Sequence, residues 1–167
     1  MTRVEAARPR LDWFGRHFLT GKAQSGWASA LRQPVGNREQ LSVFELWERK
    51  SRRNELCVFW RRNTDDLRDT LRALGLSTQT PLVVGTGHGS DFGVVEMSFD
   101  EAFSRSLGLL EGLIFLGQDL VVADNHSGGT CICCVDAQMA ERLRTLARVK
   151  KKGNAGAKKK RKSSGDK

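Results

Sequence analysis

The chain has 167 residues, and 28 lysines and arginines against 19 aspartates and glutamates give it a net charge of +9. This length predicts one domain with tails. The longest apolar stretch, residues 113–123, is too short for a membrane span, which needs about 20 apolar residues. No apolar segment follows Met1–Arg10, so we expect no signal peptide and no membrane partner. Three of the four cysteines crowd into residues 131–134, which favours a reducing compartment over a secreted disulfide framework.

The basic excess is concentrated at the C-terminal end. Residues 150–167 contain eight lysines, Arg161 and one acid, Asp166, for a net charge of +8, so residues 1–149 carry only +1. The composition therefore divides the chain into three parts. We expect a loosely ordered N-terminal arm over residues 1–40, an α+β domain over 41–149 and a disordered Lys-rich tail over 150–167.

The N-terminal 40 residues mix Gly, Pro, Gln, Ser and Arg with apolar islands near Trp13 and Trp27. This weak periodicity predicts an arm that docks on the body of the protein. An Arg-rich mitochondrial transit peptide is an alternative, although Glu5 and Asp12 argue against it, since such peptides are poor in acids.

Hydrophobic periodicity and helix-end signals predict the remaining elements. Ser98 and Glu101 have the spacing of a capping box, and Gly75 is placed to end a helix. Short connections between strands favour antiparallel pairing. We expect an α+β fold with a mostly antiparallel sheet and helices packed on one face. The expected elements are a helix over 41–53, a strand over 56–60, a helix over 64–74, strands over 82–84 and 92–97, a helix over 98–110, strands over 113–116, 120–123 and 130–135, and a helix over 137–149.

Two segments are candidates for ligand binding. The glycine-rich loop 85–91 lacks the third glycine of a dinucleotide fingerprint and the Lys-Ser/Thr pair of a phosphate loop, so it predicts a flexible connection. His126 with Cys131, Cys133 and Cys134 could supply zinc ligands, but the spacing differs from that of a Cys-x2–4-Cys knuckle. On a strand, Cys131 and Cys133 share one face and Cys134 points to the other. We therefore expect buried cysteines and no metal.

No catalytic constellation stands out in the sequence. Cys57 or Cys134 with His88 or His126 could form a nucleophilic pair only if contact distance and a lowered thiol pKa were met. We expect no enzymatic activity, no catalytic residue and no cofactor. The four tryptophans could form an exposed binding stripe, but most are expected in the core: Trp13, Trp27, Trp47 and Trp60.

The Lys-rich tail is the clearest functional signal. Apart from two alanines in a Gly/Ala spacer, this segment has no apolar residue, so it cannot bury apolar surface and should be disordered. Clustered cations on such a segment bind acidic grooves or phosphates. We expect a nuclear-targeting signal that binds importin, or an RNA or DNA contact, and a distribution between nucleus and cytoplasm; a plain solubilising tail is the alternative. The basic residues concerned are Lys150, Lys151, Lys152, Lys158, Lys159, Lys160, Arg161 and Lys162.

Residues 99–108 and 117–136 resemble the SUKH superfamily of bacterial toxin-immunity proteins and host-modulating proteins of herpesviruses and other DNA viruses. The similarity lies in an apolar strand, an acidic/Asn/Gly-Gly turn and a second strand ending in an acid. In this chain the family-like turn contains Asp124, Asn125, Gly128 and Gly129. The basic tail makes the viral branch the closer resemblance, because bacterial immunity members are usually acidic.

The resemblance implies a non-enzymatic α+β domain that binds and blocks a host or toxin protein, and some viral members also bind double-stranded RNA. A second hypothesis is a nucleic-acid-binding protein in which the tail and four arginines contact phosphates. These arginines are Arg52, Arg53, Arg61 and Arg62.

Overall fold

The computed structural model describes residues 3–32, 46, 48–61, 63–87, 93–106, 110–125 and 129–160. Among these residues, six strands and five α-helices follow one another, together with short 3-10 turns and one π-helical segment. In order these are α1 (Arg3–Phe18), α2 (Gly21–Ala30), η2 (Arg49–Ser51), β1 (Cys57–Trp60), α3 (Thr64–Ala73), η3 (Leu76–Thr78), β2 (Leu82–Gly87), β3 (Gly93–Glu96), α4 (Phe99–Glu101), η4 (Ala102–Ser106), β4 (Leu110–Leu116), β5 (Leu120–Asn125), β6 (Gly129–Cys134) and α5 (Ala137–Lys160).

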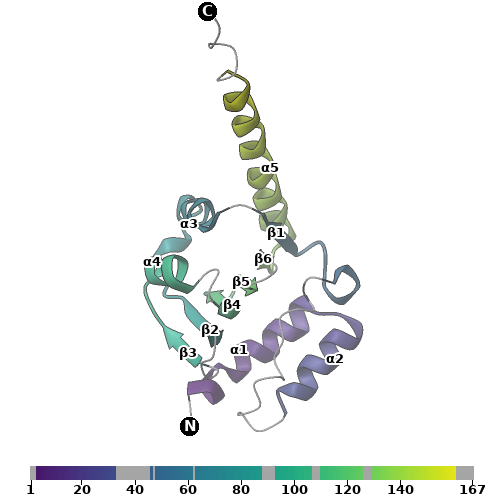
Figure 1. The fold of residues 1–167 in the computed structure, drawn as a ribbon. Helices are drawn as coiled ribbons and strands as arrows, with labels where there is room; N and C mark the ends of the chain where they lie inside the picture. Colours follow the sequence, from purple (N-terminus) through teal and green to yellow (C-terminus); the bar gives the residue numbers. More distant parts are fainter. Residues whose placement is uncertain are drawn as a thin grey trace, which may run out of the picture.

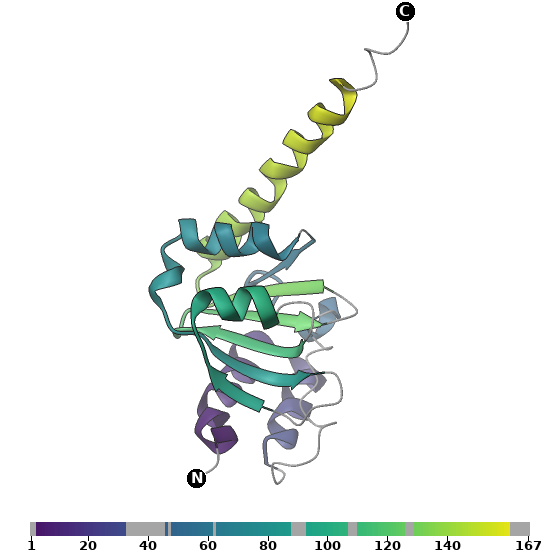
Figure 2. The same ribbon diagram turned by 60° about the vertical axis from the view of Figure 1, so that its left-hand side comes forward.

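The strands form one six-stranded sheet in the order β1-β6-β5-β4-β2-β3, and every neighbouring pair is antiparallel. The α+β class and the antiparallel sheet predicted from the sequence are confirmed. The sheet occupies the middle of the molecule, between helices (Figures 1 and 2). Tight connections such as the turn at Gly117, whose φ is +60°, reverse the chain between adjacent strands.

Alternation along the strands divides the core into two layers. On β5, Val121 and Ala123 pack with α1 and α2, while Leu120 and Val122 pack with α3, η4 and α5. Both faces of the sheet are therefore covered by helices, and not one face as the sequence analysis expected. The difference arises because the N-terminal residues supply the second helical layer.

The N-terminal residues form α1 and α2 where the sequence predicted a loosely ordered arm. Leu11, Phe14 and Phe18 of α1 are at most 2% exposed and pack against the sheet. Their spacing is helical. Trp27 of α2 is also buried, and its indole Nε1 donates a hydrogen bond to the main-chain oxygen of Leu11, at 2.7 Å. These helices are thus part of the core.

The helix-end signals in the middle of the chain act largely as expected. Ser98 and Glu101 form the predicted capping box. Asn63, one residue before the predicted start, caps α3 by accepting a hydrogen bond from Asp66 N. The helix predicted over 98–110 is shorter in the structure, because α4 passes into the π-helical η4 and β4 already begins at Leu110.

The helix predicted over 137–149 forms but is longer. The side chain of Asp136 accepts a hydrogen bond from Gln138 N at the start of α5, and the helix continues to Lys160, beyond the predicted end at Val149. It projects from the body (Figures 1 and 2). Of the helix predicted over 41–53, the described residues include the short turn η2, and the rest lies largely outside them. None of the described helices is long and apolar enough to cross a lipid bilayer.

Three glycines line up across three neighbouring strands. Gly85 of β2 is paired with Gly93 of β3 on one side and with Gly112 of β4 on the other. A Cβ atom at Gly112 would lie 2.5 Å from the main-chain oxygen of Val84, so the backbones of β2 and β4 approach too closely there for any side chain.

Candidate functional site: a buried three-cysteine cluster and an arginine-lined pocket

The pairing of β1 with β6 brings together three cysteines that are far apart in the sequence. Cys57 lies directly opposite Cys133, and Phe59 lies opposite Cys131. Because residues two apart on a strand share a face, Cys57, Cys131 and Cys133 all point to the side of the sheet covered by α1 and α2. The main-chain N–H of Cys134 donates to the carbonyl oxygen of Leu56, so this residue pair is hydrogen-bonded. Hydrogen-bonded and non-hydrogen-bonded pairs alternate along antiparallel strands, so the next pair, Cys57 and Cys133, is non-hydrogen-bonded, the type in which the Cα atoms are closer.

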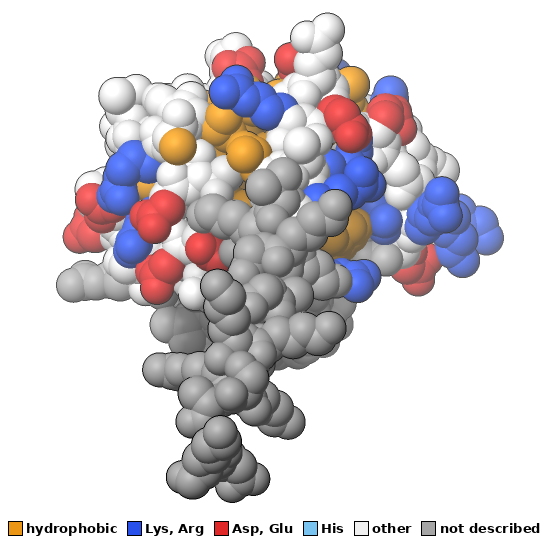
Figure 3. Space-filling view, turned by 90° about the horizontal axis from the view of Figure 1, so that it is seen from above, with side chains coloured by type: hydrophobic (Ala, Val, Ile, Leu, Met, Phe, Trp, Pro, Cys, Tyr) orange, Lys and Arg blue, Asp and Glu red, His pale blue; other side chains and the backbone are white. Residues whose placement is uncertain are grey.

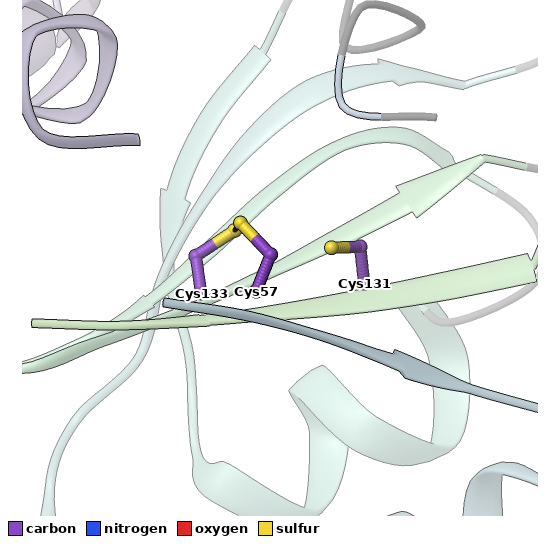
Figure 4. Close-up of side chains that lie close together, drawn as sticks. All are labelled: Cys57, Cys131 and Cys133. Carbon is purple, nitrogen blue, oxygen red and sulfur yellow. Dashed lines mark hydrogen bonds between the residues drawn. The ribbon is translucent and has the colours of Figure 1, made fainter. Parts of the chain in front are cut away.

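The three sulfur atoms form a compact group inside the protein. The Sγ atoms of Cys57 and Cys133 are 3.8 Å apart, and all three Sγ atoms lie within 4.8 Å of one another. Cys57 is 5% exposed, and Cys131 and Cys133 are fully buried. In Figure 4 the side chains of Cys57 and Cys133 turn toward each other, and the sulfur of Cys131 is directed toward them. All four cysteines are free thiols.

The contacts within the cluster lower the pKa of one thiol, that of Cys57, while the pKa values of the other two thiols are raised. Hydrogen bonds from the thiols of Cys131 and Cys133 lower the pKa of Cys57 to about 4, against the opposing effect of burial, and the charge of Arg52 acts in the same direction. Burial is the largest cause that raises the pKa of Cys133. A hydrogen bond from Cys133 favours the Cys131 thiolate, but the interaction with Cys57 and burial outweigh it and raise the pKa of Cys131.

Arg52 stands beside the cluster as a partly buried cation. Its guanidinium lies over the ring of Phe59, 4.4 Å from the centroid, and donates to Leu46 O at 2.9 Å. Its Nε is buried and finds no hydrogen-bond acceptor among the described residues. These contacts hold the Arg52 guanidinium against Phe59 and Leu46, although the sequence predicts this arginine as a possible phosphate ligand. Arg53 and Arg61 are exposed, and Arg62 lies outside the described residues.

The cysteine set differs from the one that the sequence suggested. Cys134 points to the opposite face, as predicted, and is fully buried there because that face is also covered by helices. Burial raises the pKa of Cys134 to about 12. His126 lies outside the described residues. The sequence-based set did not include Cys57. Its position in a short apolar strand, which could pair with the Cys-rich strand 130–135, was the one sequence feature that could have indicated its place in the cluster.

A second feature is a pocket between α1 and α2, which the sequence analysis missed. It has a volume of about 580 Å³. Asp12 and Arg16 form an ion pair in its wall, whereas Arg8 and Arg32 have no ion-pair partner among the described residues. The pocket carries three positive charges and one negative charge beside apolar groups. Its lining residues are Arg8, Pro9, Asp12, Arg16, Ala28, Leu31 and Arg32.

The family-like turn is built into the sheet. Asp124 and Asn125 end β5 and are 3% exposed, and Gly129, with φ +94°, begins β6 opposite Asn125. The Thr130 hydroxyl donates to the Asp124 carboxylate at 3.1 Å. Asp124 and Asn125 thus lie inside the protein and not on a contact surface. Gly128 lies outside the described residues.

Several other predicted sites can be placed. Trp27 and Trp60 are buried and Trp13 is half-buried, as expected of core residues, and Trp47 lies outside the described residues. The strands flanking the glycine-rich loop, β2 and β3, pair as a hairpin. On the face seen in Figure 3, basic and acidic side chains are interspersed on the body. The side chains of the basic tail residues 150–162 lie outside those described.

Comparisons with known proteins give no relative for this fold and site. No family model matches the chain, and no curated protein and no solved structure matches it.

Proposed function

We propose that this chain is a non-enzymatic binding protein that holds, and thereby blocks, an acidic segment of a protein partner in the pocket between α1 and α2. The observation that carries the proposal is the set of three arginines around that pocket. Arginine presents a planar fork of donors that matches a carboxylate. The resemblance to the SUKH superfamily leads to the same class of function, a host or toxin protein bound by an α+β domain.

The apolar part of the pocket favours a protein segment over a nucleic acid. Pro9, Ala28 and Leu31 line it together with the arginines. A segment with alternating acidic and apolar side chains satisfies both kinds of lining, whereas a phosphate backbone satisfies only the cations. The mixed lining therefore supports an acidic, partly apolar peptide as the bound element.

The Lys-rich tail supplies the second part of the proposal. Residues 150–167 hold +8 of the total charge of +9. We infer that this segment directs the protein to the nucleus through the acidic groove of an import receptor, while the body binds its partner. The same charge is the basis of the alternative function, phosphate contact with RNA or DNA.

A binding titration on the full-length protein tests the body's role. The probe is a fluorescent peptide of alternating Glu and Leu residues, followed by anisotropy. We expect the double variant Arg8→Glu/Arg32→Glu to weaken binding at least tenfold. The control Arg61→Glu/Arg142→Glu makes the same charge change at exposed positions away from the pocket and should leave the affinity unchanged.

A labelled oligonucleotide distinguishes the alternative. Tighter binding of the oligonucleotide than of the peptide, with a steep dependence on salt that disappears when residues 158–162 are neutralised, would assign the protein to nucleic-acid binding. Equal weakening of peptide binding by both charge-reversal pairs would overturn the pocket as the site.

A further inference from the structure

We propose that Cys57, Cys131 and Cys133 form a binding site for one Cu(I) ion, held by three sulfur atoms. This site shares no residue with the pocket between α1 and α2, so the proposal is independent of the proposed function. It rests on the positions of the three Sγ atoms and on what surrounds them.

The sulfur triangle has the size that a metal ion requires. Thiolate sulfurs lie about 2.3 Å from a bound first-row ion such as zinc, so three sulfurs around one such ion are about 4.0 Å apart. The Sγ atoms of Cys57 and Cys133 are 3.8 Å apart, and all three Sγ–Sγ separations are within 4.8 Å. Small rotations of the side chains would complete the triangle without moving either strand.

The number and kind of ligands select the ion. Thiolates prefer soft ions, among them Cu(I) and zinc. Zinc in structural sites takes four ligands. Among the described residues, no fourth Cys, His, Asp or Glu joins the group. The buried, apolar surroundings also leave little room for water as a fourth ligand. Three sulfurs in a dry site suit a three-coordinate Cu(I) ion.

Charge and proton balance can be met at this site. Each sulfur binds the ion as a thiolate, and a thiol that is still protonated loses its proton to the solvent as its S–Cu bond forms; the copper enters and stays as Cu(I), so no electron is transferred. The resulting complex is anionic. Arg52, whose charge acts on Cys57 and Cys131 and whose buried Nε has no acceptor among the described residues, offsets part of this charge.

A disulfide between Cys57 and Cys133 is the competing chemistry. Their pairing on adjacent strands suits a Cα separation in the range of disulfides. A peroxide would oxidise the two thiols to the disulfide and be reduced to water. This reaction would use two sulfurs and leave Cys131 unpaired, whereas a metal ion uses all three.

The test is an anaerobic titration of the reduced, full-length protein with Cu(I) against a coloured Cu(I) chelator. We expect one tightly bound ion per chain, a Cu–thiolate charge-transfer band, and an X-ray absorption spectrum with three sulfurs at about 2.3 Å, the distance cited above for thiolates. Cys57→Ser, Cys131→Ser and Cys133→Ser should each weaken binding at least tenfold. Cys134→Ser is the matched control, a buried cysteine on the other face, and should bind as the unmodified chain does.

If a serine variant does not fold, the X-ray absorption spectrum of the unmodified, copper-loaded protein still tests the proposal, because it counts the sulfur ligands directly. Two sulfurs or fewer around copper, no bound ion, or a loss in Cys134→Ser equal to that in the other variants would overturn the proposal. Protein that holds a Cys57–Cys133 disulfide after reduction and binds no copper would do the same. Preference for zinc with a fourth ligand would overturn the three-coordinate assignment.

Discussion

The indole Nε1 of Trp27 donates a hydrogen bond to the main-chain oxygen of Leu11 across the interface of α1 and α2, with both residues buried. The contact depends on a glycine, because a Cβ atom at Gly15 would lie 2.2 Å from Trp27 Cδ1. Gly15 is therefore the position that allows the tryptophan to lie between the two helices. This relationship leads to the first prediction.

Gly15→Ala should lower the free energy of unfolding by about 1–3 kcal/mol, the usual cost of overpacking a core. Gly26→Ala is the control, since a Cβ atom at Gly26 has nothing within 4 Å. The control should raise stability by about 0.5–1 kcal/mol, because alanine loses less conformational entropy than glycine in a helix. Urea denaturation of both variants measures the difference, and equal stabilities would contradict the packing described.

The second prediction concerns Arg144, which fastens α5 to the chain leading into β1. Its guanidinium donates to the carbonyl oxygens of Asn54, Glu55 and Cys57 at 2.8, 2.8 and 3.3 Å. Arg144→Ala should lower the free energy of unfolding by about 1.5–3 kcal/mol, as for hydrogen bonds to charged groups. Arg142→Ala, at an exposed position on the same helix, should change it by less than about 0.5 kcal/mol. Thermal unfolding of the pair measures both effects.

The third prediction is a pH dependence that follows from Cys57. Its pKa is lowered from 9.0 to about 4, so the folded protein releases this proton more readily than the unfolded chain. The associated stability is fully present above pH 9 and is lost as the pH falls through about 4. The thiolate ultraviolet absorbance of the metal-free, reduced protein at pH 7 should correspond to one thiolate.

Cysteine variants assign that absorbance. Cys57→Ser should remove it, and Cys134→Ser should not, because burial raises the pKa of Cys134 to about 12. The contribution of Cys134 to stability depends on pH in the opposite direction from that of Cys57. It is fully present below pH 9.0 and is lost as the pH rises toward about 12. Absorbance that persists in Cys57→Ser would show that another thiol is ionised.

The fourth prediction concerns the tail. Alanine at all five positions 158–162 should abolish nuclear accumulation of a fusion too large to diffuse through the nuclear pore. Stability should not change, because the buried side chains among those described on α5, Ala140 and Leu143, lie near its start and far along the helix from residues 158–162. Replacing five exposed basic residues of the body serves as the control for total charge. These are Lys22, Arg49, Lys50, Arg53 and Arg142. Nuclear signal that survives the tail substitution would remove the targeting role.

The strands could be predicted because each is a short apolar run bounded by turn residues, as in residues 120–125 and 129–134. The helix α1 was missed although Leu11, Phe14 and Phe18 recur at helical spacing, because Pro9, Gly15 and many polar residues interrupt the pattern. Tertiary packing against the sheet outweighs these weak local preferences.

The candidate sites were harder to predict than the strands. Which cysteines come together depends on strand pairing, and the pairing of β1 with β6 joins Cys57 and Cys133, which are 76 residues apart in the sequence. No local spacing encodes that contact. The arginines of the α1–α2 pocket were likewise distributed over two helices, so they could be grouped only after the helices were placed.

The row of Gly85, Gly93 and Gly112 has a consequence for evolution. At Gly112 the neighbouring strand's backbone leaves no space for a Cβ atom, so every substitution there must push β2 and β4 apart. Selection should therefore tolerate changes over much of the surface while rejecting them at this position. Distant relatives whose other residues have diverged should still carry glycine at the point where these two strands touch.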